Sequence, residues 1–420
     1  MPIFNIMDGD GEPGIGVSST EMRTPPIEDS ISLTLGVTDG RVARTTVTVS
    51  RRATAAMVLA GQPTEAAVRL VGLLFSLCGT AQTVAGLGAL EAAVARVSSP
   101  ETAAARQALV LIEAIEQGAL RIALDWAALV GATVDDVGVR ALRHDLGTAR
   151  AIVMAAVDGW DRLGGARDEA IWPPAGLADA LGAVADHLGQ WIPETATLSD
   201  SVATVRTWAE SGESVSAQAV ALALAAPPEP VSGVPLLTGW RLGAFAACLR
   251  DEADATAFMA RPEWQGRAAE TGALARHAES PVVADLLTCG AGLAARLVAR
   301  LLDLRRTEAA LGALAVGRAP PPTVTDDGPG VGLAAVETAR GLLLHRVAVT
   351  DGHVAAWQIV APTDWNAHPK GALARVPLGW VATDRAALIR RVHLLALAID
   401  PCVAYDLRVM DVRTEGRGHA

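Results

Sequence analysis

Hydrophobic and polar residues alternate in two stretches, one towards each end of the sequence. In ISLTLGVTDGRVARTTVTVS, residues 31–50, apolar side chains occupy every second position up to an Asp-Gly pair. The stretch LLLHRVAVTDGHVAAWQIV, residues 342–360, repeats the arrangement around a second Asp-Gly. A period of two predicts strands, and Asp-Gly between two such runs predicts a tight turn. We therefore predict two β-hairpins.

Between the hairpins, apolar residues recur every three or four positions, which is typical of helices. One such stripe runs through 109–129 and another through 293–311. Segments rich in Pro, Gly and other turn residues at 226–235 and 319–332 predict linkers. Residues 1–27, rich in Gly, Pro and Asp, are expected to form an irregular lead-in.

A last helical pattern follows the second hairpin at 384–400. The order hairpin, helices, hairpin, helix predicts an α+β fold that is predominantly helical. Composition agrees, because 51% of the residues are hydrophobic and the apolar volume comes largely from Ala and Leu, which favour helices. We expect one domain over 1–420.

Charge and hydropathy argue against several kinds of partner. The chain carries 35 Lys+Arg and 46 Asp+Glu, a net charge of −11, so nucleic-acid binding is not expected. The uncharged stretch between Arg69 and Glu91 contains polar residues and four glycines, which favours a buried, tightly packed helix over membrane insertion. The first residues lack the basic and apolar parts of a secretory signal, so we expect a cytoplasmic protein.

The candidate chemistry is sparse. There is no nucleophile elbow, Walker A loop or HExxH motif. His345, His353 and His368 fall in or near the second hairpin, where structural roles are expected. A free cysteine is usually a small core residue, but Cys402 stands at an Asp-Pro-Cys sequence that ends the last helix abruptly. The four cysteines are too widely spaced for a CxxC clip: Cys78, Cys248, Cys289 and Cys402.

Two of these cysteines lie in segments that resemble the metal-binding motifs of the large subunit of nickel–iron hydrogenases. That family has an early Arg-x-Cys-Gly-x-Cys-x-x-x-His motif and a late Asp-Pro-Cys-x-x-Cys-x-x-His motif. The first cysteine of each motif is present here, as Cys78 and Cys402. The second cysteine and the histidine are replaced, by Ala81 and Ala85 in the early motif and by Tyr405 and Arg408 in the late one.

Two further landmarks support the resemblance. Glu-Thr-Ala-Arg-Gly at 337–341 is similar to the family's Glu-Ala-Pro-Arg-Gly, and Pro-Thr-Asp-Trp-Asn at 362–366 is similar to its Pro-Thr-x-Trp-Asn. The similar regions span roughly 26–95 and 328–410. The resemblance implies a hydrogenase large-subunit-like helical core with two peripheral β-hairpins, in which the two ends of the chain meet at the centre.

The lost residues change the function that the resemblance implies. In the family the second cysteine of each pair bridges nickel to iron, and neither Ala81 nor Tyr405 can supply a bridging sulfur. Ordinary hydrogenase activity and nickel binding are therefore not expected. The pattern resembles hydrogenase accessory proteins of the HupK/HoxV type, which are large-subunit paralogues implicated in building the active site. We expect a non-catalytic scaffold.

The residues that remain suit an iron that brings its own ligands. An iron with two cyanides and one carbonyl needs only two or three more donors, and Cys78 and Cys402 could supply two thiolates. In the family, residues matching Arg340 and Pro362-Thr363 line the pocket for the diatomic ligands, to which a guanidinium and a hydroxyl can donate. The expected cargo is an iron dicyanide–carbonyl fragment, received from maturation proteins and passed to the hydrogenase large-subunit precursor.

Other interpretations stay open. Cys78 and Cys402 could be residual core thiols, with Arg340 paired to an acid such as Asp400 in a metal-free docking protein. Large-subunit relatives without metal ligands hold a quinone in respiratory complexes, although a quinone site gives no reason to keep these residues together. An oxidoreductase with an altered metal site is a third option. Family precursors are clipped after the histidine that Arg408 replaces, so no clipping is expected here.

Overall fold

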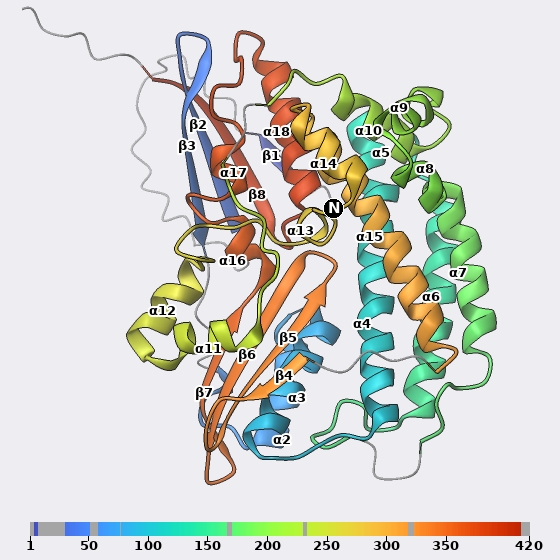
Figure 1. The fold of residues 1–420 in the computed structure, drawn as a ribbon, viewed down its shortest axis with the longest axis vertical. Helices are drawn as coiled ribbons and strands as arrows, with labels where there is room; N and C mark the ends of the chain where they lie inside the picture. The colour runs from blue at the N-terminus through green and yellow to red at the C-terminus, as the bar shows by residue number, and fades with distance from the viewer. Residues whose placement is uncertain are drawn as a thin grey trace, which may run out of the picture.

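The computed structural model describes residues 30–50, 58–75, 77–165, 170–229, 233–317 and 323–412, and the backbone of 4–6. Long helices form one side of the molecule and two β-sheets lie on the other, one above the other (Figure 1). A large buried core joins residues from near the N-terminus, such as Leu33, to residues near the C-terminus, such as Leu407. The helical α+β fold predicted from the sequence is confirmed.

The helical side is built around α4 (Pro100–Leu120), which continues through a π-helical turn, η1 (Arg121–Trp126), into α5 (Ala127–Val130). It packs against α6 (Asp136–Ala156) and α15 (Gly292–Leu314), and α6 packs against α7 (Leu177–Trp191). The predicted apolar stripes lie in these helices, and most of their residues are buried. The shorter helices are α8 (Thr195–Ser199), α9 (Val202–Ser211), α10 (Val215–Leu224), α11 (Leu242–Arg250), α12 (Glu252–Ala260), α13 (Ala273–Arg276) and α14 (Pro281–Thr288).

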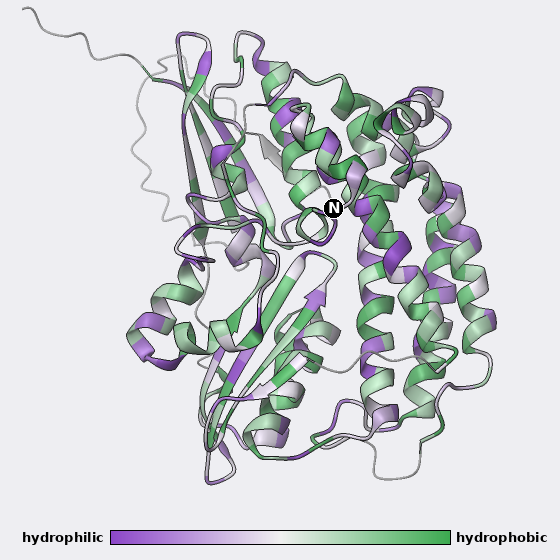
Figure 2. Cartoon of the chain, viewed as in Figure 1, coloured by the Kyte–Doolittle hydropathy of each residue, from purple (hydrophilic) through white to green (hydrophobic). Residues whose placement is uncertain are grey.

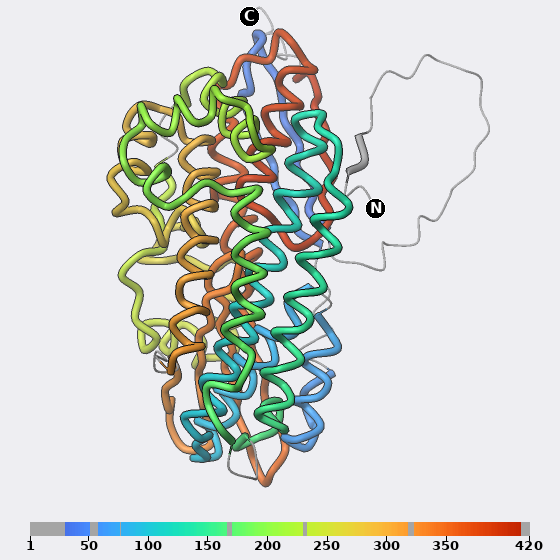
Figure 3. Tube along the Cα trace, turned by 90° about the vertical axis from the view of Figure 1, so that its right-hand side faces the viewer, coloured from blue at the N-terminus to red at the C-terminus, as the bar shows by residue number. Residues whose placement is uncertain are grey.

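The first predicted hairpin is formed by β2 (Ser30–Thr38) and β3 (Arg41–Ser50). Its sheet has the order β1-β8-β2-β3, in which β8 (Ala404–Asp411) runs parallel to both β2 and the short β1 (Phe4–Ile6). Strand β8 was not predicted. In Figures 1 and 3 the blue N-terminal strands accordingly lie beside the red C-terminal segment. The rest of the expected lead-in lies outside the described residues.

The second predicted hairpin is β6 (Gly341–Thr350) and β7 (His353–Val360), within a sheet of order β4-β5-β6-β7. Strands β4 (Thr323–Asp326) and β5 (Val331–Thr338) extend it, so the expected linker at 319–332 is partly strand. In both hairpins the Asp-Gly pair has positive φ, as a primed turn requires: 51° and 67° in one, 49° and 75° in the other. The expected linker at 226–235 separates α10 from α11 where it is described.

The sequence predicted a single helix in the uncharged segment after Arg69, but the structure has two helices there. Helix α2 (Thr64–Leu74) ends before Cys78, and α3 (Gly79–Ala93) begins after it. Helix α3 packs on β5 and β6, where Gly332 lets the backbones approach: a Cβ there would lie 2.1 Å from the Ala89 carbonyl oxygen. In the described part of the chain, no helix is long and apolar enough to cross a membrane.

Candidate functional site

The four sequence motifs meet at the junction of the helical side and the two sheets. Cys78 lies between α2 and α3, and Arg340 lies in the turn between β5 and β6. Pro362 and Thr363 begin α16 (Pro362–Asn366), and Cys402 follows α18 (Arg385–Ile399). The structure therefore brings the predicted site residues together, although the first and last are more than three hundred positions apart.

Cys402 and Thr363 form the most direct contact in the site. The Thr363 hydroxyl lies 2.9 Å from the Cys402 sulfur, and either group can donate the hydrogen bond. Pro362 stands at the first helical position of α16, where its fixed φ suits the start of a helix and its missing N–H costs nothing. Thr363 follows it, so its side chain is held beside the end of α18.

Cys78 is the residue that immediately precedes α3, and its side chain is largely enclosed. The pKa of its thiol is raised to about 12, chiefly by burial and also by the nearby Cys402 and Glu113, against lowering by Gln82 and Arg340. Cys402 and Arg340 are thus close enough to Cys78 to act on its charge. At physiological pH Cys78 is therefore a neutral thiol in these surroundings.

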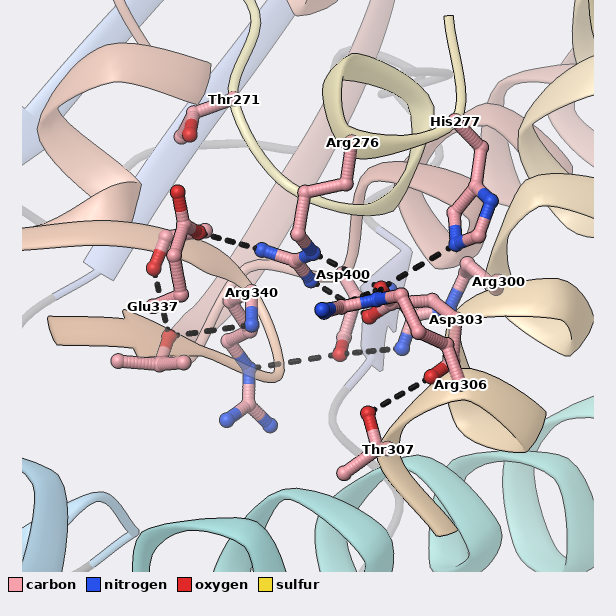
Figure 4. A network of polar contacts seen from close by, with 12 residues as sticks. Thr271, Arg276, His277, Arg300, Asp303, Arg306, Thr307, Glu337, Arg340 and Asp400 are labelled. Carbon is pink, nitrogen blue, oxygen red and sulfur yellow. Dashed lines mark hydrogen bonds and ion pairs between the residues drawn. The ribbon is translucent and has the colours of Figure 1, made fainter. Parts of the chain in front are cut away.

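Between the two cysteines and the helices lies Asp400, which is 1% exposed and is contacted by three arginines. Its carboxylate lies 2.6 Å from Arg121 Nη2, 2.8 Å from Arg300 Nη2 and 3.4 Å from Arg340 Nε. Figure 4 shows Arg300 and Arg340 reaching Asp400 from opposite sides. Asp125 neutralises only one of these cations, through Arg121 at 2.7 Å. Three arginines thus face two carboxylates.

The pKa shifts reflect this excess of positive charge. Burial alone would raise the pKa of Asp400, but Arg340, Arg121 and Arg300 together hold it well below its ordinary value. Burial lowers the pKa of Arg300, and repulsion by Arg121 and Arg340 lowers it further, against the attraction of Asp400. Asp400 also adopts a left-handed backbone, with φ of 59°, which Asp tolerates better than most residues and which ends α18 before Pro401.

The turn that carries Arg340 is fixed by its neighbours. Its backbone N–H donates to the Thr338 hydroxyl at 3.2 Å, and the adjacent Gly341 has φ of 133°, a conformation that requires glycine. Leu342 N–H donates to the Thr271 hydroxyl at 3.0 Å. The Arg340 side chain is buried and donates from Nη1 to Gln117. Its Nε, which lies 3.4 Å from Asp400, is buried and has no hydrogen-bond partner among the described residues.

Sequence reasoning missed a polar stripe on α4 and η1 that connects these parts. In Figure 2 hydrophilic residues interrupt the largely hydrophobic colouring of this helix. The signal was present, because polar side chains spaced by four positions lie on one helix face. The stripe consists of Glu113, Gln117, Arg121 and Asp125. Glu113 accepts from the backbone N–H groups of Thr80 and Ala81, and Gln117 bonds the Leu77 carbonyl and Arg340. Arg121 contacts Asp400 and also Asp125, the last member of the stripe.

A second arginine cluster, in which Arg306 is exposed, lies beside the first and is balanced in charge (Figure 4). Asp303 lies 2.6 Å from Arg276 Nη2 and 3.0 Å from Arg306 Nη2, and Glu337 lies 2.6 Å from Arg276 Nη1. Burial would raise the pKa of Asp303, but Arg276, His277 and Arg306 hold it well below its ordinary value. A cavity of about 70 Å³ lies between this cluster, α4 and Arg300.

Several known proteins are similar in sequence to this chain. The hydrogenase expression/formation protein HupV of Azotobacter chroococcum is 32% identical over 380 residues, covering 89% of this chain and 94% of HupV. HoxV of Cupriavidus necator, of the same description, is 32% identical, covering 83% of this chain and 89% of its own. HupK of Azotobacter vinelandii is 34% identical, covering 89% of this chain and 94% of its own. This chain belongs to the HupK/HoxV/HupV family of hydrogenase expression/formation proteins.

The fold of this family member is that of a nickel–iron hydrogenase large subunit. A family model described as nickel-dependent hydrogenase matches residues 306–377. The nickel–iron–selenium hydrogenase of D. vulgaris Hildenborough in the reduced state is similar with a TM-score of 0.54 and 19% identity, over 87% of this chain and 94% of that one. The hydrogenase of Dm. baculatum, in its H2-activated and anaerobically purified form, has a TM-score of 0.55 and 16% identity, over 87% and 94%.

The positions where this family member departs from the hydrogenase motifs are not polar cavities. Ala81 and Ala85 are fully buried and pack with Leu343 and Ala361 in an apolar cluster. Tyr405 is buried on β8, with its hydroxyl against His393, and burial raises its pKa. Arg408, four positions before the end of the described chain, is exposed. Buried apolar or aromatic side chains therefore stand at three of the four lost ligand positions.

The remaining candidate ligands do not join the site. Cys248 lies on α11 and Cys289 is exposed at the end of α14. His353 lies at a hairpin turn, and His368 is buried near α16. Within the described ranges, no group of three or more His, Cys, Asp or Glu side chains is arranged to hold a metal ion.

Proposed function

We propose that this protein is a non-catalytic carrier in the formation of a nickel–iron hydrogenase, and that its cargo is an iron dicyanide–carbonyl fragment. Its family membership gives the coarser part, a role in hydrogenase formation. The finer part rests on one observation: two cysteines more than three hundred positions apart in the sequence lie close enough for their charges to interact, beside a buried excess of arginine.

The chemistry of the donor set suits this cargo. Cys78 and Cys402 offer two soft sulfur ligands, which is enough for an iron that already carries three strongly bound ligands. The Thr363 hydroxyl, 2.9 Å from the Cys402 sulfur, can donate to that thiolate or to a cyanide nitrogen.

The charge of the pocket favours the same cargo. Two thiolates on the fragment introduce negative charge into a buried site, where it is costly unless compensated. The excess positive charge around Asp400 compensates it, and Arg340 contributes its guanidinium to that excess. Because the fragment is held by few protein ligands, it can also be released, as a carrier requires.

The same reasoning defines the partners. The cargo is received from hydrogenase maturation proteins and passed to the hydrogenase large-subunit precursor in the cytoplasm. The C-terminal segment is expected to stay attached, because residues 409–411 belong to β8, which pairs with β2. Clipping after Arg408 would remove part of that strand.

Infrared spectroscopy of protein isolated from maturation-competent cells tests the proposal. We expect bands of metal-bound carbonyl and cyanide, with about one iron and no nickel per chain. Cys78→Ala and Cys402→Ala should each abolish the bands, because one thiolate cannot chelate. Cys248→Ala and Cys289→Ala are matched controls, since both thiols lie outside the site.

The alternative is a metal-free docking or quinone-site role. The pairing of Arg340 with Asp400 is the contact which that interpretation expects. If the Cys78→Ala/Cys402→Ala double variant still supports hydrogenase formation at full rate, the carrier mechanism is wrong and docking explains the protein.

A further inference from the structure

A chain of buried hydrogen bonds leads from the second sheet to the sulfur of Cys78. Trp357 Nε1 lies 3.1 Å from His345 Nδ1, His345 Nε2 lies 2.7 Å from Gln82 Oε1, and Gln82 Nε2 lies 3.7 Å from the Cys78 sulfur. Trp357 and His345 come from β7 and β6, and Gln82 lies in the first turn of α3. Of these hydrogen bonds, the site described above involves only the last, from Gln82 to the Cys78 sulfur.

The direction of every bond follows from its first member. The indole N–H of Trp357 can only donate, so Nδ1 of His345 accepts. His345 is 0% exposed, and burial lowers its pKa to about 3, so the ring is neutral and its proton is on Nε2. Nε2 therefore donates to the carbonyl oxygen of Gln82, which leaves the Gln82 amino group facing the sulfur.

The packing around the chain is specific to it. The rings of His345 and Trp357 meet edge to face, with centroids 5.9 Å apart and planes at 79°. They approach α3 at Gly86, where an added Cβ would lie 2.7 Å from Trp357 Cζ2. Gln82 is itself 1% exposed, so it has little freedom to turn its amide the other way.

We propose that Gln82 is a positioning residue for Cys78: locked by His345 and Trp357, it donates a hydrogen bond to the sulfur and keeps it directed at Cys402. These hydrogen-bonded residues, Trp357, His345 and Gln82, form a relay that controls the orientation of the Cys78 sulfur and its electron donation to bound iron. The effect on electron donation rests on the proposed carrier function, whereas the effect on sulfur orientation also applies to the protein without bound cargo.

Protein without bound cargo provides the first test. In a Cys248→Ser/Cys289→Ser background, the bifunctional thiol reagent dibromobimane can join only Cys78 and Cys402. We expect Gln82→Leu to slow this cross-link several-fold, and Trp357→Phe, which removes only the indole N–H and leaves a smaller ring, to slow it less. Thr83→Val is the matched control, because Thr83 follows Gln82 on α3 and its hydroxyl, among the described residues, donates to the Gly79 carbonyl at 2.7 Å and not to Cys78.

Glycine substitutions separate the relay from general packing. Gly86→Ala should slow the cross-link as Gln82→Leu does, because it displaces Trp357. Gly88→Ala crowds the same helix against Val324 Cγ1, at 2.9 Å, but touches no member of the relay, and should leave the rate unchanged. If Gln82→Leu and Trp357→Phe both cross-link at the parent rate, the positioning role is wrong.

Iron-loaded protein provides the second test. Without the Gln82 donor the thiolate gives more electron density to iron, so the carbonyl band of Gln82→Leu should move to lower wavenumber while that of Thr83→Val stays in place. Loss of such a supporting residue should weaken iron retention about 10–100-fold. A carbonyl band that does not move would overturn the electronic role of the relay.

The two tests distinguish the failures. If the parent protein carries no carbonyl or cyanide bands but its cross-link depends on Gln82, the carrier function is wrong and the positioning of Cys78 stands. If the bands are present but neither their position nor the cross-link responds to Gln82, the carrier function stands and the relay is only a packing feature.

Discussion

The two arginine clusters of Figure 4 lie side by side but differ in charge balance. Around Asp303, two arginines face Asp303 and Glu337, and His277 lies 3.4 Å from Asp303. Around Asp400, three arginines share one fully buried carboxylate, and Asp125 compensates only one of them. The first cluster is electrically complete, whereas the second has a surplus cation next to two thiols.

The difference separates structural from functional charge. A balanced cluster holds α13, α15 and β5 together and needs nothing more. An unbalanced one is costly when empty, because desolvated like charges repel, and it is relieved when an anionic group enters. The following predictions test whether this contrast is real.

The largest expected effect is on stability. Asp400→Asn should leave three buried arginines without their shared counter-charge and cost about 3–5 kcal/mol in the free energy of unfolding. Asp303→Asn should cost less, about 1.5–3 kcal/mol, because Glu337 still pairs with Arg276. Urea unfolding of both variants measures the difference, and equal losses would remove the distinction between the clusters.

The next effect concerns cargo. Arg340→Leu should weaken iron retention about 10–100-fold, as loss of an outer ligand-supporting residue does. Arg340→Lys should be intermediate, because it keeps the charge but loses the planar set of donors. Arg276→Leu, in the balanced cluster, should lower stability and leave the carbonyl and cyanide bands in place. Retention measured as iron per chain after dialysis tests all three.

The pH dependence should also differ. Asp400 and Asp303 both have pKa values below the ordinary one, so the stability they contribute is present above about pH 4 and is lost only as the pH falls below it. Cargo binding must remove the proton of Cys78, whose pKa is raised to about 12. Fragment affinity should therefore rise by up to about tenfold per pH unit between pH 7 and 8, a range in which urea stability stays nearly flat because neither carboxylate titrates and the unfolded thiol is still mostly protonated. An affinity that falls with pH contradicts the thiolate mechanism.

The smallest expected effect concerns the polar stripe of α4. Gln117→Leu removes a side chain that accepts from Arg340 and donates to the Leu77 carbonyl, and should cost about 1–2 kcal/mol in the free energy of unfolding. Gln107→Leu is a matched control on the same helix, at the cavity beside the Asp303 cluster. Gln107 is half-buried and makes no side-chain hydrogen bond within the described residues, so its loss should stay within about 0.5 kcal/mol. Similar losses in both would argue that the stripe has no special role.

Much of the fold could be predicted from local patterns. The alternation ending in Asp39-Gly40 and Asp351-Gly352 predicted both hairpins, because primed turns need residues that accept positive φ. Strand β8 was missed because it pairs with β2 across nearly the whole chain, and its short alternating run follows a helix without a turn of its own. The break between α2 and α3 was missed because hydropathy does not change there.

The candidate site could likewise be predicted only in part from the sequence. Family motifs pointed to Cys78, Cys402, Arg340 and Thr363, and the structure brings these side chains together. The arginines that complete the site, Arg121 and Arg300, belong to no motif, and burial of an arginine on a long helix cannot be inferred from helical periodicity alone.

The sequence by itself determined which groups are available: two cysteines without their usual partners, the Asp-Pro turn that ends α18, and residues with strong helix or hairpin preferences. These are local properties, set by side-chain chemistry and backbone sterics. Only the tertiary structure decided that three arginines share Asp400 and that Gln82 faces the Cys78 sulfur. Charge balance and hydrogen-bond direction in a buried site depend on which distant elements meet there, because burial removes the water that would otherwise compensate each group.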